Sequence, residues 1–274
     1  MSKLLGGRLS IIYTQKEWIA LKIAISGKGG VGKTTFAANF ARWLSQKGVT
    51  VLAVDADPDA SLGTLLGISE DVLEDLKPIV DMKALIEERM GGSGAYYSLN
   101  PQVDDILDDY SVTMGTLRFF RMGNIKGGGT SCYCKENSFL QALVNSLILG
   151  EKDTVILDMG AGIEQLTRGT AQGVDVLVIV TEPTKVSAQT VKVIQKLALE
   201  LGIPRVVVIG NKVRNSKDEN FLRDHFPIEQ LIGIIPYSDE LMEMSINTGN
   251  AQLAVGSLSV QLDTIYQEII GEGR

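Results

Sequence analysis

The residues most clearly suited to chemistry lie in a glycine-rich run near the start of the chain. Residues 27–34 read Gly-Lys-Gly-Gly-Val-Gly-Lys-Thr and match the phosphate-binding pattern G-x-x-x-x-G-K-S/T at every required position. The run lies between a predicted strand, 21–26, and a predicted helix, so its N–H groups and the helix N-terminus can surround phosphate oxygens. Lys33 is expected to reach the β- and γ-phosphates, and the Thr34 hydroxyl to ligate Mg²⁺. This segment supplies the expected nucleotide-binding residues Gly27, Lys28, Gly29, Gly30, Val31, Gly32, Lys33, Thr34 and Thr35.

The second residue of the loop, Lys28, is not part of the general pattern. It belongs to a deviant version, Lys-Gly-Gly-Val-Gly-Lys-Thr, and with it the chain resembles the dimeric ATPases that include MinD, ParA and nitrogenase iron protein. The resemblance implies a homodimer that hydrolyses ATP with Mg²⁺. It also implies that Lys28 crosses the dimer interface and touches the nucleotide of the partner subunit.

Two acidic segments follow predicted buried strands and complete the expected reaction chemistry. Residues 55–59, Asp-Ala-Asp-Pro-Asp, resemble switch I of that family, and residues 158–162, Asp-Met-Gly-Ala-Gly, resemble its Walker B and switch II. Asp57 is expected to position and deprotonate the attacking water, which makes Lys28, Lys33 and Asp57 the predicted catalytic residues. Asp57 and Asp158 are expected to hold Mg²⁺ through water, since Mg²⁺ keeps several of its waters. Gly160 is expected to donate its N–H to the γ-phosphate.

The base pocket is predicted from a motif that departs from its guanine-reading form. Residues 211–214, Asn-Lys-Val-Arg, resemble the pattern Asn-Lys-x-Asp, but Arg214 replaces the final carboxylate. Guanine presents two donors that a carboxylate accepts and an arginine cannot, so the sequence favours ATP over GTP. In the family, the asparagine and the segment after the next strand hold adenine, which implies Asn211, Pro236 and Tyr237 here.

The two cysteines of the chain, Cys132 and Cys134, are separated by a single tyrosine. Such a pair makes a poor intramolecular disulfide, which favours a reduced, cytoplasmic protein. Two thiolates are half of a four-coordinate site, and a second copy of the pair in a twofold dimer would complete it. Lys126 and Lys135 nearby would help to keep the thiols ionised.

Longer runs make the resemblance more specific. Residues 121–128 followed by the cysteine pair, and residues 158–170, 211–214 and 233–237, look like the CooC family, the nickel-insertion ATPases of carbon monoxide dehydrogenase. The resemblance covers about residues 21 to 270. It implies a metallochaperone that binds nickel, or zinc in its place, at an intersubunit Cys132/Cys134 site. The implied client is carbon monoxide dehydrogenase or the related acetyl-CoA synthase.

The order of apolar runs predicts an α/β fold with three layers, the P-loop NTPase fold, in which helices cover both faces of a mostly parallel sheet. Residues 1–20 are expected to form a leader outside the fold. Residues 21–274 are expected to form a single ATPase domain with an inserted metal-loop region at about 70–150. The predicted strands are 21–26, 49–54, 117–122, 155–157, 174–180, 205–209 and 231–235, and the predicted helices include 72–90 and 186–201.

Composition limits the partners and leaves other functions open. The net charge of −7 argues against a nucleic-acid partner, and no apolar stretch is long enough to span a membrane. A MinD-like positioning ATPase would end in a basic amphipathic helix, whereas acidic residues flank the terminal apolar stripe here. A nitrogenase-reductase-like iron–sulfur ATPase remains the other alternative.

Overall fold

The computed structural model describes residues 20–57, 59–91, 98, 101–103, 105–123, 134–146, 153–161, 173–241 and 251–271, without the side chains of 134–137, 145 and 251–255. Cys132 and nearly all of the expected leader lie outside these ranges.

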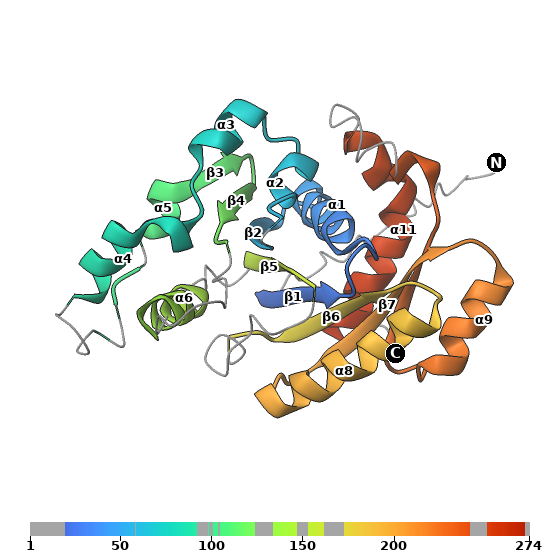
Figure 1. Cartoon of the computed structure of the whole chain (residues 1–274). Coiled ribbons are helices and arrows are strands. Elements are labelled where there is room, and N and C mark those ends of the chain that lie inside the picture. The colour runs from blue at the N-terminus through green and yellow to red at the C-terminus, as the bar shows by residue number, and fades with distance from the viewer. Residues whose placement is uncertain are drawn as a thin grey trace, which may run out of the picture.

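The fold is built on an eight-stranded sheet with the order β3-β4-β2-β5-β1-β6-β7-β8 (Figure 1). All neighbouring pairs are parallel except β3 and β4, which form an antiparallel edge. The mostly parallel sheet expected from the sequence is therefore confirmed. The strands are β1 (Leu21–Gly27), β2 (Thr50–Ala56), β3 (Ser111–Met114), β4 (Leu117–Arg121), β5 (Asp153–Met159), β6 (Val176–Thr181), β7 (Val206–Val213) and β8 (Leu231–Pro236).

The central strands are apolar on both sides because helices cover both faces. Along β2, Val51 and Ala53 face one hydrophobic core, while Leu52 and Val54 face the other. The first core is closed by α1 (Lys33–Gln46), α2 (Leu62–Leu65) and α11 (Ala251–Ile270). The second is closed by α4 (Lys83–Met90), α5 (Ile106–Tyr110), α6 (Cys134–Ser146), α8 (Lys185–Leu201) and α9 (Ser216–His225). Figure 1 shows this three-layer arrangement, with α1 and α11 on one side of the sheet and α6 and α8 on the other.

The terminal apolar stripe is part of the core. Leu258, Leu262, Ile265, Tyr266 and Ile269 are all buried, in the same core as α1 and β8. The ring of Tyr266 lies 5.9 Å from that of Trp43 on α1. A membrane-binding role of this helix face is therefore excluded by its burial. Within the described ranges, no helix is both long and apolar enough to cross a membrane.

The acidic stretch that the sequence predicts as one helix, 72–90, is broken, so that expectation is wrong. The structure has α3 (Glu70–Asp75), a 3₁₀ turn η1 (Ile79–Asp81) and α4. Pro78 separates them because proline has no N–H for the helix ladder and disfavours helical backbone at the residue before it. The same region also contributes β3 and β4, which extend the main sheet rather than form a separate layer.

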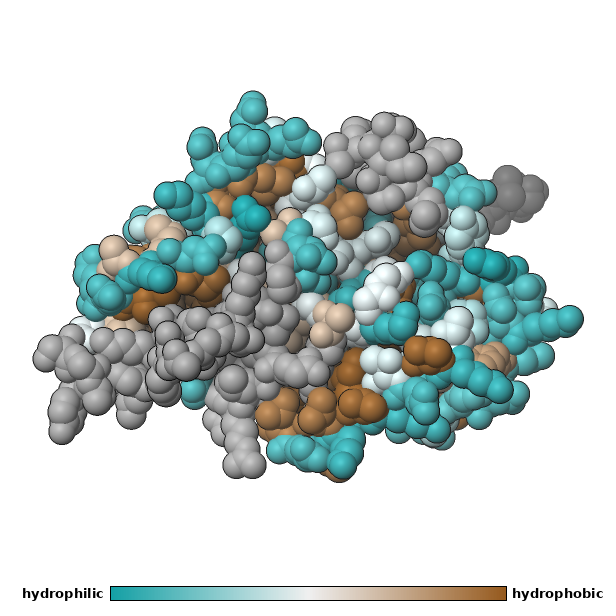
Figure 2. Space-filling view, viewed as in Figure 1, coloured by the Kyte–Doolittle hydropathy of each residue, from teal (hydrophilic) through white to brown (hydrophobic). Residues whose placement is uncertain are grey.

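The visible surface carries both hydrophilic and hydrophobic areas. Figure 2 shows hydrophilic residues over α3 and α9 and a hydrophobic patch beside α8. Two exposed valines, Val186 and Val193, belong to α8.

Gly123, just after β4, adopts a backbone conformation that other residues avoid and lies in a space that they cannot enter. Its φ is +76°, and an added Cβ would lie 2.8 Å from Pro78 Cβ and 2.7 Å from Val80 Cγ2. Gly115, in the β3–β4 turn, has a similar φ of +65° but open space around it.

We expect Gly123→Ala to lower the free energy of unfolding by roughly 3 kcal/mol, because overpacking adds to the cost of left-handed backbone. Gly115→Ala, the matched control, should cost only about 1 kcal/mol of backbone strain. Urea unfolding of both variants measures the difference. Equal destabilisation would contradict the close contact of Gly123 with Pro78 and Val80.

Candidate nucleotide site

The predicted site residues gather at one edge of the sheet, where the parallel strands end. A cavity of about 590 Å³ opens there between α1, the segment after β2 and the ends of β7 and β8. The predicted residues that line it are Gly29, Gly30, Gly32, Lys33, Thr34, Thr35, Asp57, Asn211, Pro236 and Tyr237. Ligands of open α/β sheets bind at this carboxyl edge.

Two glycines of the loop 27–34 are required by its geometry. Gly27 has φ +151°, and a Cβ there would lie 2.2 Å from the Val180 carbonyl oxygen. Gly32 has φ +93°, and a Cβ there would meet Asn211 Nδ2 at 2.5 Å. Both neighbours are close because the loop passes over the ends of β6 and β7.

The N-terminus of α1 is left open toward the cavity. Gly32 is its N-cap, so no side chain caps the helix, and its first turn carries no acidic residue. Lys33 is buried, and among the described residues its ammonium makes one long hydrogen bond, 3.5 Å from the Lys28 carbonyl oxygen. A helix N-terminus with unused N–H groups and a nearby lysine is suited to bind phosphate.

Asp158 is a buried carboxylate that the described protein groups do not satisfy. It is fully buried on β5, and neither of its oxygens has a hydrogen-bond partner of ordinary geometry in the described part of the chain, although the Thr34 hydroxyl lies close enough to favour the ionised form. Burial raises the pKa of Asp158 to about 7; Asp55 and Asp57 raise it further, while the nearby Thr34 hydroxyl and Lys33 ammonium lower it. A buried carboxylate of this kind is stabilised by a nearby cation or by a bound proton.

Asp55 lies directly beside Asp158, since the two residues are paired in the β2–β5 register. Burial raises the pKa of Asp55 to about 6, although two backbone N–H groups and Arg121 act in the opposite direction. Those N–H groups belong to Asp57 and Leu62, at 3.2 and 3.1 Å from the carboxylate. Asp55 thus holds the segment that carries Asp57 as well as closing its strand.

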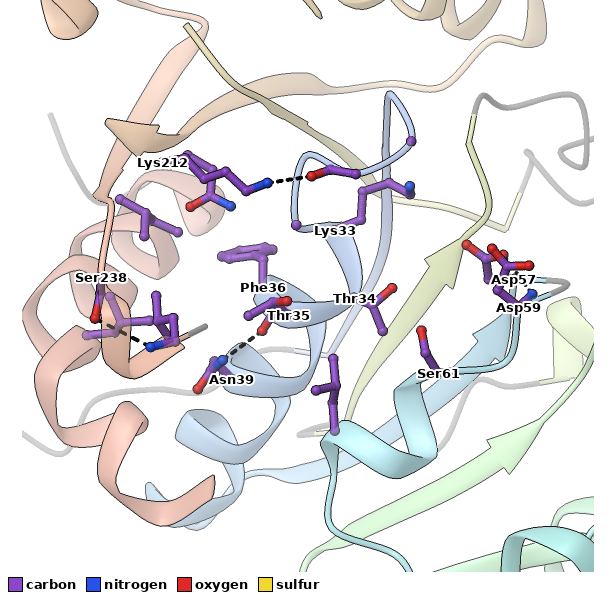
Figure 3. Close-up of a pocket in the computed structure, with 18 of the residues that line it drawn as sticks. Lys33, Thr34, Thr35, Phe36, Asn39, Asp57, Asp59, Ser61, Lys212 and Ser238 are labelled. Carbon is purple, nitrogen blue, oxygen red and sulfur yellow. Dashed lines mark hydrogen bonds between the residues drawn. The ribbon is translucent and has the colours of Figure 1, made fainter. Parts of the chain in front are cut away.

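The donor set fits Mg²⁺, which prefers oxygen ligands. Thr34, Asp57 and Asp158 are the oxygen-bearing residues that would hold it, and the unpartnered oxygens of Asp158 are the observation that favours a cation here. Figure 3 shows Thr34 and Asp57 facing the same part of the cavity, with Ser61 beside them.

The segment after β7 contacts the phosphate loop with two consecutive side chains. Asn211 Nδ2 donates to the Val31 carbonyl oxygen at 2.8 Å. Lys212 Nζ donates to the Gly30 carbonyl oxygen at 2.6 Å (Figure 3). Lys212 has φ +57°, unusual for a residue other than glycine. The sequence predicts a role in nucleotide binding for Asn211 and none for Lys212. The signal for Lys212 is its place at the second position of the Asn-Lys-x-Arg motif.

The cavity is also lined by residues that have no predicted role in the site. Phe36, Asn39, Thr64, Leu65, Leu241 and Leu258 make up an apolar wall with a few polar atoms. The sequence does not distinguish these residues as part of a cavity, because apolar residues on α1 and α11 also fill the core.

Other predicted residues lie around the cavity or apart from it. Gly160 follows β5 directly, next to Ala161 in the cavity wall. Lys28 is partly exposed in the loop. Cys134 is the first residue of α6, on the opposite face of the sheet from α1. Within the described residues, no three histidine, cysteine, aspartate or glutamate side chains cluster as a metal site.

Comparison with known proteins identifies the family. The model for the CobQ/CobB/MinD/ParA nucleotide-binding domain matches residues 22–249. The carbon monoxide dehydrogenase accessory protein CooC of Rhodospirillum rubrum is 40% identical over 224 residues, 81% of this chain and 85% of that protein. The chain belongs to this family. It is a CooC-type P-loop ATPase.

Solved structures support the fold independently. The MinC:MinD cell division protein complex of Aquifex aeolicus matches with a TM-score of 0.66 at 23% identity, over 92% of this chain and 96% of that one. MinD of Pyrococcus horikoshii, solved with Mg-ADP, matches with a TM-score of 0.60 at 20% identity, over 92% and 95%. The P-loop NTPase fold of this CooC-type ATPase is thereby confirmed.

The burial of Asp158 predicts a stability that depends on pH. Because its pKa is raised to about 7 in the folded chain, its proton stabilises the nucleotide-free fold fully at acid pH, and that stabilisation is lost as the pH rises through about 7. Asp158→Asn removes the buried charge. We expect it to raise the free energy of unfolding at pH 8 by roughly 1–3 kcal/mol, and Tm by several degrees.

Thermal melts without nucleotide at pH 5.5 and pH 8 measure this effect, which should shrink at the lower pH. Asp59→Asn changes an exposed carboxylate of the same cavity and is the control, expected to leave Tm unchanged. A lower Tm of Asp158→Asn at pH 8 would show that the ionised carboxylate is satisfied in the nucleotide-free fold.

Proposed function

We propose that the protein is a dimeric, ATP-hydrolysing metallochaperone that supports nickel insertion into carbon monoxide dehydrogenase or the related acetyl-CoA synthase. The observation that carries the proposal is the Cys132-Tyr133-Cys134 motif within a chain 40% identical to the accessory protein CooC. Two cysteines separated by a single residue make a poor disulfide, which fits work in the reducing cytoplasm. Neither a nucleic acid nor a membrane is among the proposed partners.

Hydrolysis would use the phosphate loop and the two strand-end acids. ATP would place its phosphates at the N-terminus of α1, where Lys33 contacts the β- and γ-phosphates. Mg²⁺, held by Thr34 and through water by Asp57 and Asp158, would neutralise charge on the phosphoryl oxygens. Asp57 would orient the attacking water and take its proton. The N–H of Gly160 would contact the γ-phosphate and so distinguish ATP from ADP.

Lys28 would act across the dimer interface. Its carbonyl oxygen accepts the contact from Lys33 within its own subunit, while its side chain lies on a partly exposed loop. A second subunit placed over this edge would receive that ammonium at its own nucleotide, as the family resemblance implies. Cations supplied in this way stabilise the charge of the transferred phosphoryl group.

The metal cargo would be bound by Cys132 and Cys134 of both subunits. Cys134 begins α6, a helix of 13 residues. Four thiolates match the preference of nickel or zinc for soft ligands in defined geometry.

The backbone links the nucleotide edge to the chain that leads to the cysteines. The Asp55 carbonyl oxygen accepts from the N–H groups of Met122 and Gly123 at 2.9 and 3.0 Å. The carboxylate of the same residue holds Asp57 and Leu62. A change at Asp57 on hydrolysis would therefore reach the start of the cysteine-bearing segment through one residue.

We expect one nickel or zinc ion per dimer in the wild type and none in Cys132→Ser or Cys134→Ser. Each subunit offers only two thiolates, so the metal should also favour the dimer by linkage, even without ATP. Metal analysis combined with size-exclusion chromatography measures both. Ser131→Ala, a change in the same segment that spares the thiols, is the matched control and should retain metal.

The function is tested by activation of nickel-free carbon monoxide dehydrogenase with nickel, ATP and each variant. The cysteine variants should keep ATPase activity, because the phosphate loop is intact, yet fail to activate the client. One tightly bound ion per monomer, or metal retained by Cys134→Ser, would exclude the shared site. Activation by the cysteine variants would exclude their role in delivery.

A further inference from the structure

The ring of Tyr237 forms part of the cavity wall at the end of β8. Its backbone N–H donates to the Val213 carbonyl oxygen at 2.9 Å, which fixes the main chain of the two strand ends together. The side chain lines the cavity and is 40% exposed. An aromatic ring whose main chain alone is held would keep rotational freedom that ligand binding would have to remove.

Arg214 lies over that ring. The central carbon of its guanidinium is 5.4 Å from the Tyr237 ring centroid, within the range of a cation–π contact. The Arg214 backbone N–H donates to Asp218 Oδ2 at 3.0 Å. In the part of the chain that the structure describes, no carboxylate forms an ion pair with the guanidinium. Its observed partner is therefore the tyrosine ring.

The local backbone accounts for this placement. The β7–β8 register shifts between Gly210 and Val213, and Lys212 within that shift has φ +57°. Such an irregularity redirects the side chains that follow it. Asn211 and Lys212 consequently contact the phosphate loop, while Arg214 lies against Tyr237.

We propose that Arg214 is a positioning residue for the nucleotide base, acting through Tyr237. The guanidinium holds the ring in place as an aromatic wall of the base pocket before the nucleotide binds. This role rests on the proposed ATPase function and on the placement of the base beside Tyr237 that the family resemblance implies. It is distinct from the absence of a guanine-reading carboxylate, because it assigns the arginine a positive contribution to binding.

The test compares a ligand that has a base with one that lacks it. Arg214→Ala should weaken binding of Mg-ADP about two- to fivefold, the range of an exposed cation–π contact, and leave binding of inorganic tripolyphosphate unchanged. Arg214→Lys keeps the cation and should restore most of the affinity. Calorimetric titration of the full chain gives each dissociation constant. In steady-state assays, the KM for ATP should rise while kcat stays unchanged.

A double-mutant cycle separates action through the ring from direct contact. In Tyr237→Phe, which keeps the ring, Arg214→Ala should cause the same two- to fivefold loss, whereas in Tyr237→Ala the further change Arg214→Ala should have no effect. An equal loss in both backgrounds, an equal loss for tripolyphosphate, or no loss in Arg214→Ala would overturn the proposal. Failure of the wild type to bind Mg-ADP would instead contradict the proposed nucleotide site itself.

Discussion

Two acidic side chains, Asp55 and Asp158, lie side by side in the β2–β5 register at the buried carboxyl edge of the sheet. Like charges in a desolvated place are costly, and the pKa of each carboxyl is raised. Backbone N–H groups partly satisfy Asp55, whereas the described protein leaves both oxygens of Asp158 without a partner. A magnesium-bound nucleotide would offset this cost, so its binding would raise the free energy of unfolding.

The surrounding elements follow from that arrangement. The helix N-terminus of α1 and Lys33 supply positive charge on one side of the acids, and Arg121 lies next to Asp55 in the β2–β4 register on the other. Arg121 also donates to the Leu73 and Leu76 carbonyl oxygens, at the end of α3. Asp55 connects two parts of the chain. Its carboxylate accepts hydrogen bonds from Asp57 and Leu62, and its carbonyl oxygen accepts them from the residues just after β4.

Much of the fold and of the site follows from local sequence. The glycine pattern at 27–34 and the buried strands that end in acids could be recognised because each depends on neighbouring residues. The edge strand β3 could not be assigned, since so short a strand has weak periodicity. The helix break could have been predicted from Pro78, which disfavours helical backbone at the residue before it. Contacts across the chain, such as Lys212 with Gly30 and Arg214 with Tyr237, require the strand order and the β7–β8 irregularity.

If the buried acids Asp55 and Asp158 form part of a site for a magnesium-bound nucleotide, nucleotide binding should release protons. Calorimetric titration with Mg-ADP at pH 7, in buffers of different ionisation enthalpy, measures the protons released. Because the pKa of Asp158 is about 7 in the nucleotide-free chain, a nearby cation should displace its proton. We expect the wild type to release protons when it binds Mg-ADP, and we expect most of this release to be lost in Asp158→Asn. No release, or equal release by both proteins, would contradict this expectation.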